Sequence, residues 1–101
     1  MRDSDVSPFD MADYLTDPET IAEYLRAALE SNDAAEIAAA FGTVTRAIGP
    51  TELAEKTGLS RNQLYASFKP GGNPTLKSIT RLADAFGIRL TAVTVQAAAA
   101  A

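Results

Sequence analysis

The middle of this chain carries the start and stop signals of two short helices separated by a tight turn. Pro50 suits the first position of a helix, and Gly58 suits the left-handed residue that ends one, because glycine has no Cβ to oppose a positive φ. Ser60 and Gln63 have the spacing of a capping box at the start of a second helix. Residues 50–68 therefore predict two helices joined by a turn.

The second of these helices has one apolar side and one polar side. Leu64 and Phe68, four residues apart, lie on the side that faces a core, and Leu59 fills the corner of the turn. The outer side is left with Arg61, Asn62, Tyr65 and Ala66. Side chains of this kind on a short exposed helix can reach base edges in the major groove of DNA. The pattern predicts a DNA-binding helix-turn-helix.

The formal net charge of the chain is −4, which on its own argues against binding to DNA. The charge is unevenly divided, however. Residues 1–42 carry two basic and ten acidic side chains, whereas residues 43–101 carry seven basic and three acidic ones. A basic half attracts phosphates, and an acidic half repels them or attracts a basic protein. A merely solvated acidic surface is the alternative interpretation of the first half.

The composition excludes several kinds of chemistry. The chain of 101 residues, enough for one domain, has no cysteine and no histidine. Disulfides, thiol nucleophiles, histidine bases and the usual zinc ligands are therefore absent. Glu52 and Glu55 lie on an exposed side of a predicted helix, where the sequence indicates no pocket. We expect no enzyme activity, no cofactor and no metal site.

The hydropathy of the chain indicates no membrane partner. No apolar run approaches the roughly 20 residues needed to span a bilayer, and no signal peptide opens the chain. A cytoplasmic protein is expected.

Two helices are predicted before residue 50. Asp17 and Pro18 form an N-cap and a first helical position, which start a helix over 18–31. Asp33 caps the next helix, which Gly49 ends. The apolar stripe of that second helix is Ile37, Ala40, Phe41, Val44 and Ile48. A glycine within it, Gly42, indicates close packing against a neighbouring helix.

A fifth helix and a strand are predicted after the helix-turn-helix. Thr75 caps the helix and Gly87 ends it, and its inner face is Leu76, Ile79, Leu82, Ala83 and Phe86. Residues 88–95 are β-branched and largely alternating, which predicts a strand. A lone strand has unpaired edges, so it must pair with a second copy in a dimer or with a partner protein.

The predicted domain thus covers residues 18–95, with a helix-turn-helix at 50–68. Residues 1–17 form an acidic, partly flexible segment, and residues 96–101 form an alanine tail to which we assign no function. The fold class is mainly α.

Several motifs resemble known families. Leu53-Ala54, Gly58-Leu59-Ser60-Arg61 and Asn73-Pro74-Thr75 look like the five-helix Cro/repressor type of helix-turn-helix, with an N-terminal helical extension and a short C-terminal β-strand here. The wider pattern, with Asp13-Tyr14-Leu15 and Gly58 to Tyr65, resembles addiction-module antidote proteins, the HigA-type antitoxins of bacterial toxin–antitoxin pairs. The similarity covers about residues 10–92.

This resemblance implies two activities. Such proteins neutralise a RelE-like toxin, typically a basic mRNA endonuclease, by direct binding, and they repress their own operon by binding operator DNA. The base-facing positions of the family correspond to Ser60, Arg61, Asn62 and Ala66. Thr51 matches a phosphate-contact position. Many repressors carry glutamine where this chain has Pro50-Thr51, and proline has no N–H to donate to a phosphate.

Each candidate DNA contact has a simpler alternative. Arg61 suits guanine and Asn62 suits adenine, each worth roughly 1–3 kcal/mol of discrimination, although both could merely be solvated. Gln63 serves the capping box without any DNA. Tyr65 stacks on the DNA backbone or packs on the following loop. The candidate backbone contacts are Lys69, Asn73 and Lys77.

The candidate toxin-binding residues lie near the N-terminus. Phe9, Met11 and Tyr14 could anchor a toxin, or they could simply cover the core. The aspartates among residues 3–17 would complement a basic toxin and speed its capture. A homodimer paired through 88–95 would place two recognition helices about 34 Å apart. Two other functions remain open: a stand-alone or phage-type repressor without a toxin, and a protein-interaction adaptor that does not bind DNA.

Overall fold

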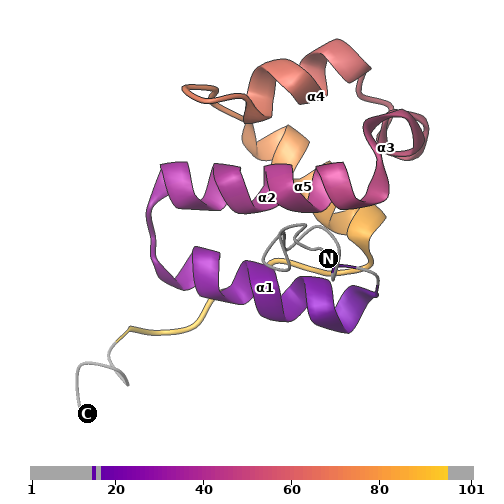
Figure 1. The fold of residues 1–101 in the computed structure, drawn as a ribbon. Helices are drawn as coiled ribbons and strands as arrows, with labels where there is room; N and C mark the ends of the chain where they lie inside the picture. Colours follow the sequence, from indigo (N-terminus) through magenta and orange to yellow (C-terminus); the bar gives the residue numbers. More distant parts are fainter. Residues whose placement is uncertain (1–14, 16, 96–101) are drawn as a thin grey trace, which may run out of the picture.

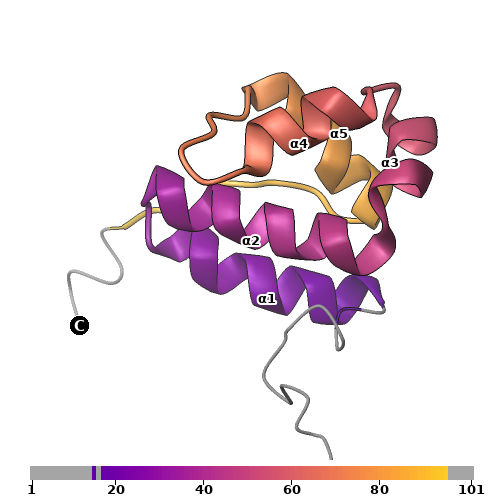
Figure 2. The same ribbon diagram turned by 45° about the horizontal axis from the view of Figure 1, so that its top comes forward.

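Five helices make up the computed structural model, which describes residue 15 and residues 17–95 (Figure 1). They are α1 (Pro18–Glu30), α2 (Ala34–Ile48), α3 (Pro50–Thr57), α4 (Arg61–Phe68) and α5 (Leu76–Phe86). Figures 1 and 2 show α1 and α2 side by side, with α3, α4 and α5 on the other side of α2. No strand is present among the described residues, and none of their helices is long and apolar enough to cross a membrane.

Polar side chains start the helices where the sequence predicts. The Asp17 carboxylate accepts a hydrogen bond from the Thr20 amide at 2.8 Å, and Asp33 accepts one from Ala35 at 2.8 Å. Thr75 Oγ1 accepts from the Ser78 amide at 3.0 Å. Each cap satisfies an amide that has no partner inside its helix. The predicted starts of α1, α2 and α5 are therefore confirmed.

The core forms where α2 meets α3 and α5. Phe41, Leu53 and Leu82 come from these three helices and are completely buried. The rings of Phe41 and Phe86 lie 5.9 Å apart between centroids, a favourable separation for an aromatic pair. The buried stripe predicted for α2 is thus the centre of the domain.

Gly42 allows α2 and α4 to come close together. A Cβ on Gly42 would lie 3.3 Å from Phe68 Cβ, tighter than ordinary van der Waals contact. The prediction that this glycine marks close helix packing is confirmed, and its neighbour is α4.

The prediction that Leu76 belongs to the inner face of α5 is wrong. Its side chain is 74% exposed, and the buried residue of the first turn is Ser78. Cα–Cβ bonds in a helix tilt toward its N-terminus, so the side chain of the first residue projects past the helix end. Leu76 therefore extends beyond the core.

The strand predicted over 88–95 is not observed in the single chain. Ile88 and Leu90 are half-buried against the core, whereas Val93 and Val95 are 83% and 76% exposed. Strands require the hydrogen bonds of a neighbouring strand, and the described residues provide none. Two predicted segments lie outside the described residues. These are the acidic segment, of which only residues 15 and 17 are described, and the alanine tail. The candidate toxin-binding residues Phe9, Met11 and Tyr14 belong to the part that is not described.

We predict that Gly42→Leu lowers the free energy of unfolding by about 1–3 kcal/mol, because the added side chain is forced against Phe68. Urea unfolding measures the change. Ala39→Leu is the matched control, since Ala39 lies on the exposed side of the same helix. Equal stability of the two variants would contradict the close packing of α2 against α4.

Candidate nucleic-acid interface

The turn between α3 and α4 is held by local hydrogen bonds. Gly58 has a left-handed φ of 77°, and Leu59 is buried beneath the corner. The Thr57 hydroxyl donates to the Leu53 carbonyl at 2.7 Å and accepts from the Leu59 amide at 3.1 Å. Thr57 thus links the last turn of α3 to the first residue after the glycine. Sequence analysis did not single it out.

A long-range contact fixes the same turn. The Arg81 guanidinium on α5 donates to the Thr57 carbonyl at 3.2 Å. This hydrogen bond satisfies a carbonyl at the C-terminal end of α3, where the helix dipole is negative. Arg81 was predicted only as one of the positive charges, because no local pattern reports a partner 24 residues away.

The capping box at the start of α4 is present. Gln63 Oε1 accepts from the Ser60 amide at 2.7 Å, and Ser60 Oγ accepts from the Gln63 amide at 3.0 Å. Both side chains are exposed. Each oxygen accepts one backbone hydrogen bond in the cap, so each keeps one lone pair for a ligand, beside the hydroxyl proton of Ser60 and the amide N–H bonds of Gln63.

The outer side of α4 is exposed to solvent. Leu64 is buried, and the residues predicted to face outward, Arg61, Asn62, Tyr65 and Ala66, are all exposed. Tyr65 is 57% exposed, so more than half of its surface is accessible to a partner. Within residues 17–95, the side chains of Arg61 and Asn62 form no hydrogen bond or ion pair. The predicted surface therefore exists and is accessible.

The other candidate contacts surround this surface. Lys69, Asn73 and Lys77, after α4, are exposed. Thr51 is exposed near the start of α3, whose N-cap Gly49 contributes no side-chain hydrogen bond. Pro50 has no N–H to donate, and the amide of the next residue, Thr51, has no side-chain cap.

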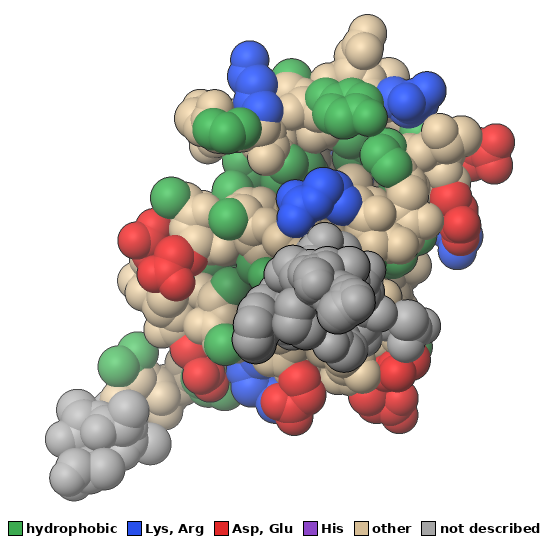
Figure 3. Space-filling model, viewed as in Figure 1, with side chains coloured by type: hydrophobic (Ala, Val, Ile, Leu, Met, Phe, Trp, Pro, Cys, Tyr) green, Lys and Arg blue, Asp and Glu red, His purple; other side chains and the backbone are tan. Residues whose placement is uncertain are grey.

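Charge is distributed favourably for an anionic ligand. Residues 57–83 contain four basic side chains and no acidic one. Figure 3 shows basic side chains near α4, and acidic side chains along α1, at the start of α2 and on α3. On α3, Lys56 and Glu52 lie 3.1 Å apart, an exposed pair of little energetic weight.

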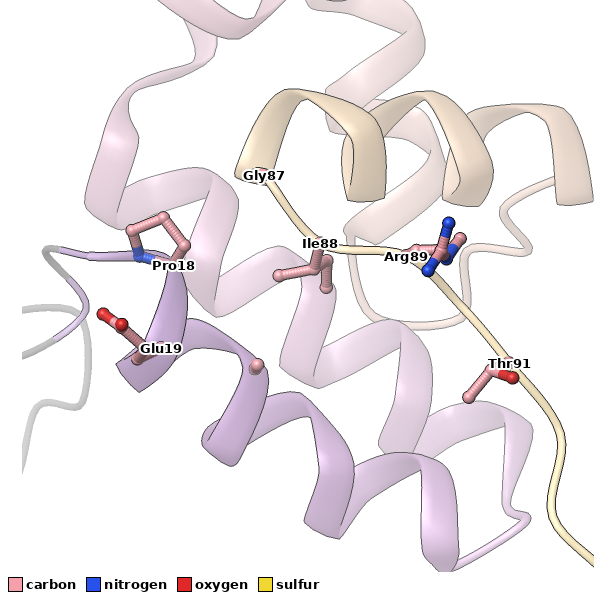
Figure 4. Close-up of a pocket in the computed structure, with 7 residues that line it drawn as sticks. Pro18, Glu19, Gly87, Ile88, Arg89 and Thr91 are labelled. Atoms are coloured by element: carbon pink, nitrogen blue, oxygen red, sulfur yellow. The ribbon is translucent and has the colours of Figure 1, made fainter.

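A shallow groove lies elsewhere, between the start of α1 and the segment after α5. Pro18, Glu19, Ile88, Arg89 and Thr91 line it (Figure 4). Glu19 and Arg89 point away from each other across the groove. No group of three or more potential metal ligands occurs in the part of the chain that the structure describes. The expectation that the chain is not an enzyme stays a prediction.

The chain is similar to known proteins over most of its length. A family model described as a probable addiction module antidote protein matches residues 5–94, which include all five helices and the α4 surface. An uncharacterized protein of Haemophilus influenzae is 32% identical over 81 residues, which cover 80% of this chain and 84% of that protein. No solved structure matches the chain. The extent of the family match shows that the chain belongs to the probable addiction module antidote proteins.

Proposed function

We propose that this antidote protein has two partners, a RelE-like toxin that it neutralises by direct binding and the operator DNA of its own operon, which it represses. Membership of the antidote family supports a toxin partner. The observation that supports DNA binding is the exposed polar side of α4, in a region with four basic residues and no acidic one.

In the proposed DNA complex, α4 is the recognition helix of a Cro/repressor-type helix-turn-helix and enters the major groove. Arg61 donates to guanine O6 and N7, and Asn62 pairs with adenine. Ser60, the N-cap of α4, and Ala66 are also exposed. Contacts to the phosphates come from Lys69, Asn73 and Lys77 after α4, and from Thr51 on α3.

A homodimer fits the segment after α5. Val93 and Val95 are exposed and two residues apart, so an extended chain places them on one face. Pairing of this segment with its copy across a two-fold axis would cover both valines and would satisfy the strand hydrogen bonds that a single chain lacks. The dimer then presents two α4 helices to a palindromic operator.

The toxin would bind away from α4. Glu19, Glu23 and Glu30 are exposed on α1, which lies on the opposite side of α2 from α4 (Figures 1 and 2). An acidic surface attracts a basic toxin and accelerates its association. The apolar residues Phe9, Met11 and Tyr14 supply anchors in this proposal. This arrangement leaves the DNA surface free while toxin is bound.

Two alternatives make different predictions. A stand-alone repressor binds DNA without co-purifying with the product of a neighbouring gene. An adaptor co-purifies with a protein but does not shift DNA even at low salt. Family membership favours the antidote over both.

We predict that the protein shifts its upstream promoter DNA in a gel, with a dissociation constant that rises steeply with salt. Arg61→Ala should weaken binding by about 1–3 kcal/mol and relax specificity at one base pair. Arg26→Ala is the control, because Arg26 is an exposed arginine on α1 that pairs with Glu23. Equal affinities of the two variants would show that α4 does not read DNA.

We also predict that the product of the neighbouring gene is a short basic protein that co-purifies with this chain. Glu19→Lys combined with Glu30→Lys should slow association with that toxin, and high salt should narrow the difference from wild type. Surface plasmon resonance measures the association rates of the wild type and of the double variant. Arg61→Ala is the control here and should leave toxin binding unchanged. Unaltered association of the double variant at low salt would place the toxin on another surface.

A further inference from the structure

The loop after α4 begins with a well-defined turn. The Gly72 amide donates to the Lys69 carbonyl at 2.8 Å, and Gly71 has a φ of +80°. A turn with proline second, a positive-φ glycine third and this hydrogen bond is a type II β-turn. Pro70 also fixes its own φ, so the turn has few alternative conformations.

Gly72 then lies directly against the end of α4. A Cβ at this position would be 2.5 Å from the Ser67 carbonyl oxygen and 2.6 Å from the Ala66 carbonyl oxygen. Real Cβ atoms essentially never come so close, and both obstacles are backbone atoms that cannot rotate aside. Only glycine fits here, although its φ is not in the left-handed region. The constraint at Gly72 is therefore close approach, not backbone conformation.

This contact affects where the two candidate backbone-contacting residues of the loop lie. Lys69 opens the loop and Asn73 follows Gly72, so both are attached to a turn that is seated on the last carbonyls of α4. Figure 1 shows the loop leaving the end of α4 and returning to α5. The Lys69 amide donates a hydrogen bond to the Tyr65 carbonyl at 3.0 Å, and the Lys69 carbonyl accepts one from the Gly72 amide. Displacing Gly72 would therefore move Asn73 and reorient the backbone at Lys69, while Phe68 keeps its contact with Gly42.

We propose that Gly72 is a positioning residue for DNA binding, which seats the loop 69–74 on the end of α4 so that Lys69 and Asn73 meet the DNA backbone while α4 occupies the groove. The proposal rests on the DNA-binding function proposed above. It adds a residue that contacts no DNA itself and acts through the loop.

The test is to titrate operator DNA with wild type, Gly72→Ala and Lys69→Gln at several salt concentrations. Lys69→Gln should reduce the slope of log affinity against log salt by about 0.9, the value of one lost phosphate contact. Gly72→Ala should reduce the slope similarly and weaken binding about ten-fold, as expected for one charge-assisted hydrogen bond. The variant that combines Gly72→Ala with Lys69→Gln should bind DNA no more weakly than Gly72→Ala alone, because Gly72→Ala already removes the contact of Lys69 with a phosphate.

The slope separates positioning from a loss of stability. A smaller folded fraction weakens apparent binding equally at every salt concentration and leaves the slope unchanged. Gly71→Asn is the control that keeps the turn, since asparagine tolerates a positive φ, and it should retain both affinity and slope. If Gly72→Ala does not fold, one glycine inserted between Gly71 and Gly72 opens the turn that ties Gly72 to Lys69 without adding a Cβ, and it should lower the slope in the same way.

The outcomes distinguish this proposal from the function on which it rests. Wild-type binding together with an unchanged slope in the loosened-loop variant, or in a folded Gly72→Ala, would overturn the role of Gly72 and leave DNA binding intact. An unchanged slope in Lys69→Gln would overturn it as well. A wild-type protein that fails to bind the promoter at low salt would overturn both.

Discussion

The orientation of α4 depends on the turn that joins it to α3. A helix of eight residues with a single fully buried side chain, Leu64, would not be stable by itself. The Thr57 hydroxyl, the Arg81 guanidinium and the buried Leu59 fix its N-terminal end. At its C-terminal end, Phe68 sits against Gly42 and the loop sits against the last carbonyls. Both ends are held, so the outer side can be polar without loss of structure.

The separation of charge explains how a chain of net charge −4 is compatible with a surface for nucleic acid. At physiological salt the Debye length is about 8 Å, so exposed charges on α1 are largely screened from a ligand at α4. The helix α2 lies between them (Figure 2). A ligand at α4 meets the local charge of residues 57–83, which is positive, together with Glu52 and Glu55 on the neighbouring α3, and not the average of the chain.

Features that depend on neighbours in the sequence could be predicted, and features that depend on distant partners could not. The caps at Asp17, Asp33 and Ser60 involve partners within three residues, and the helix starts they predict are those observed. Helical periodicity placed Leu76 on an inner face, but periodicity carries no information on where the core ends. A strand at 88–95 requires hydrogen bonds to a partner strand, which the described part of the single chain does not contain.

The same reason explains which site residues were predicted. The outer side of α4 follows from the positions of Leu64 and Phe68, so its four residues were identified from spacing alone. Arg81 and Gly72 act through contacts to Thr57, Ala66 and Ser67 that no local pattern specifies. Two adjacent glycines are a local signal for a turn, but only the structure shows that the second one, Gly72, touches a helix. The family resemblance and the family match agree on the antidote proteins.

The capping box also affects what α4 could recognise in the proposed complex. Gln63 Oε1 and Ser60 Oγ each accept one backbone hydrogen bond, which leaves each oxygen a single lone pair beside its donor groups. Arg61, next to them, is a donor only. Arg61 is thus the side chain of the first turn of α4 that can only donate, and guanine offers two acceptors in the groove. In the proposed complex Arg61 therefore favours guanine opposite the N-terminal turn, and Asn62, which both donates and accepts, is the residue suited to adenine.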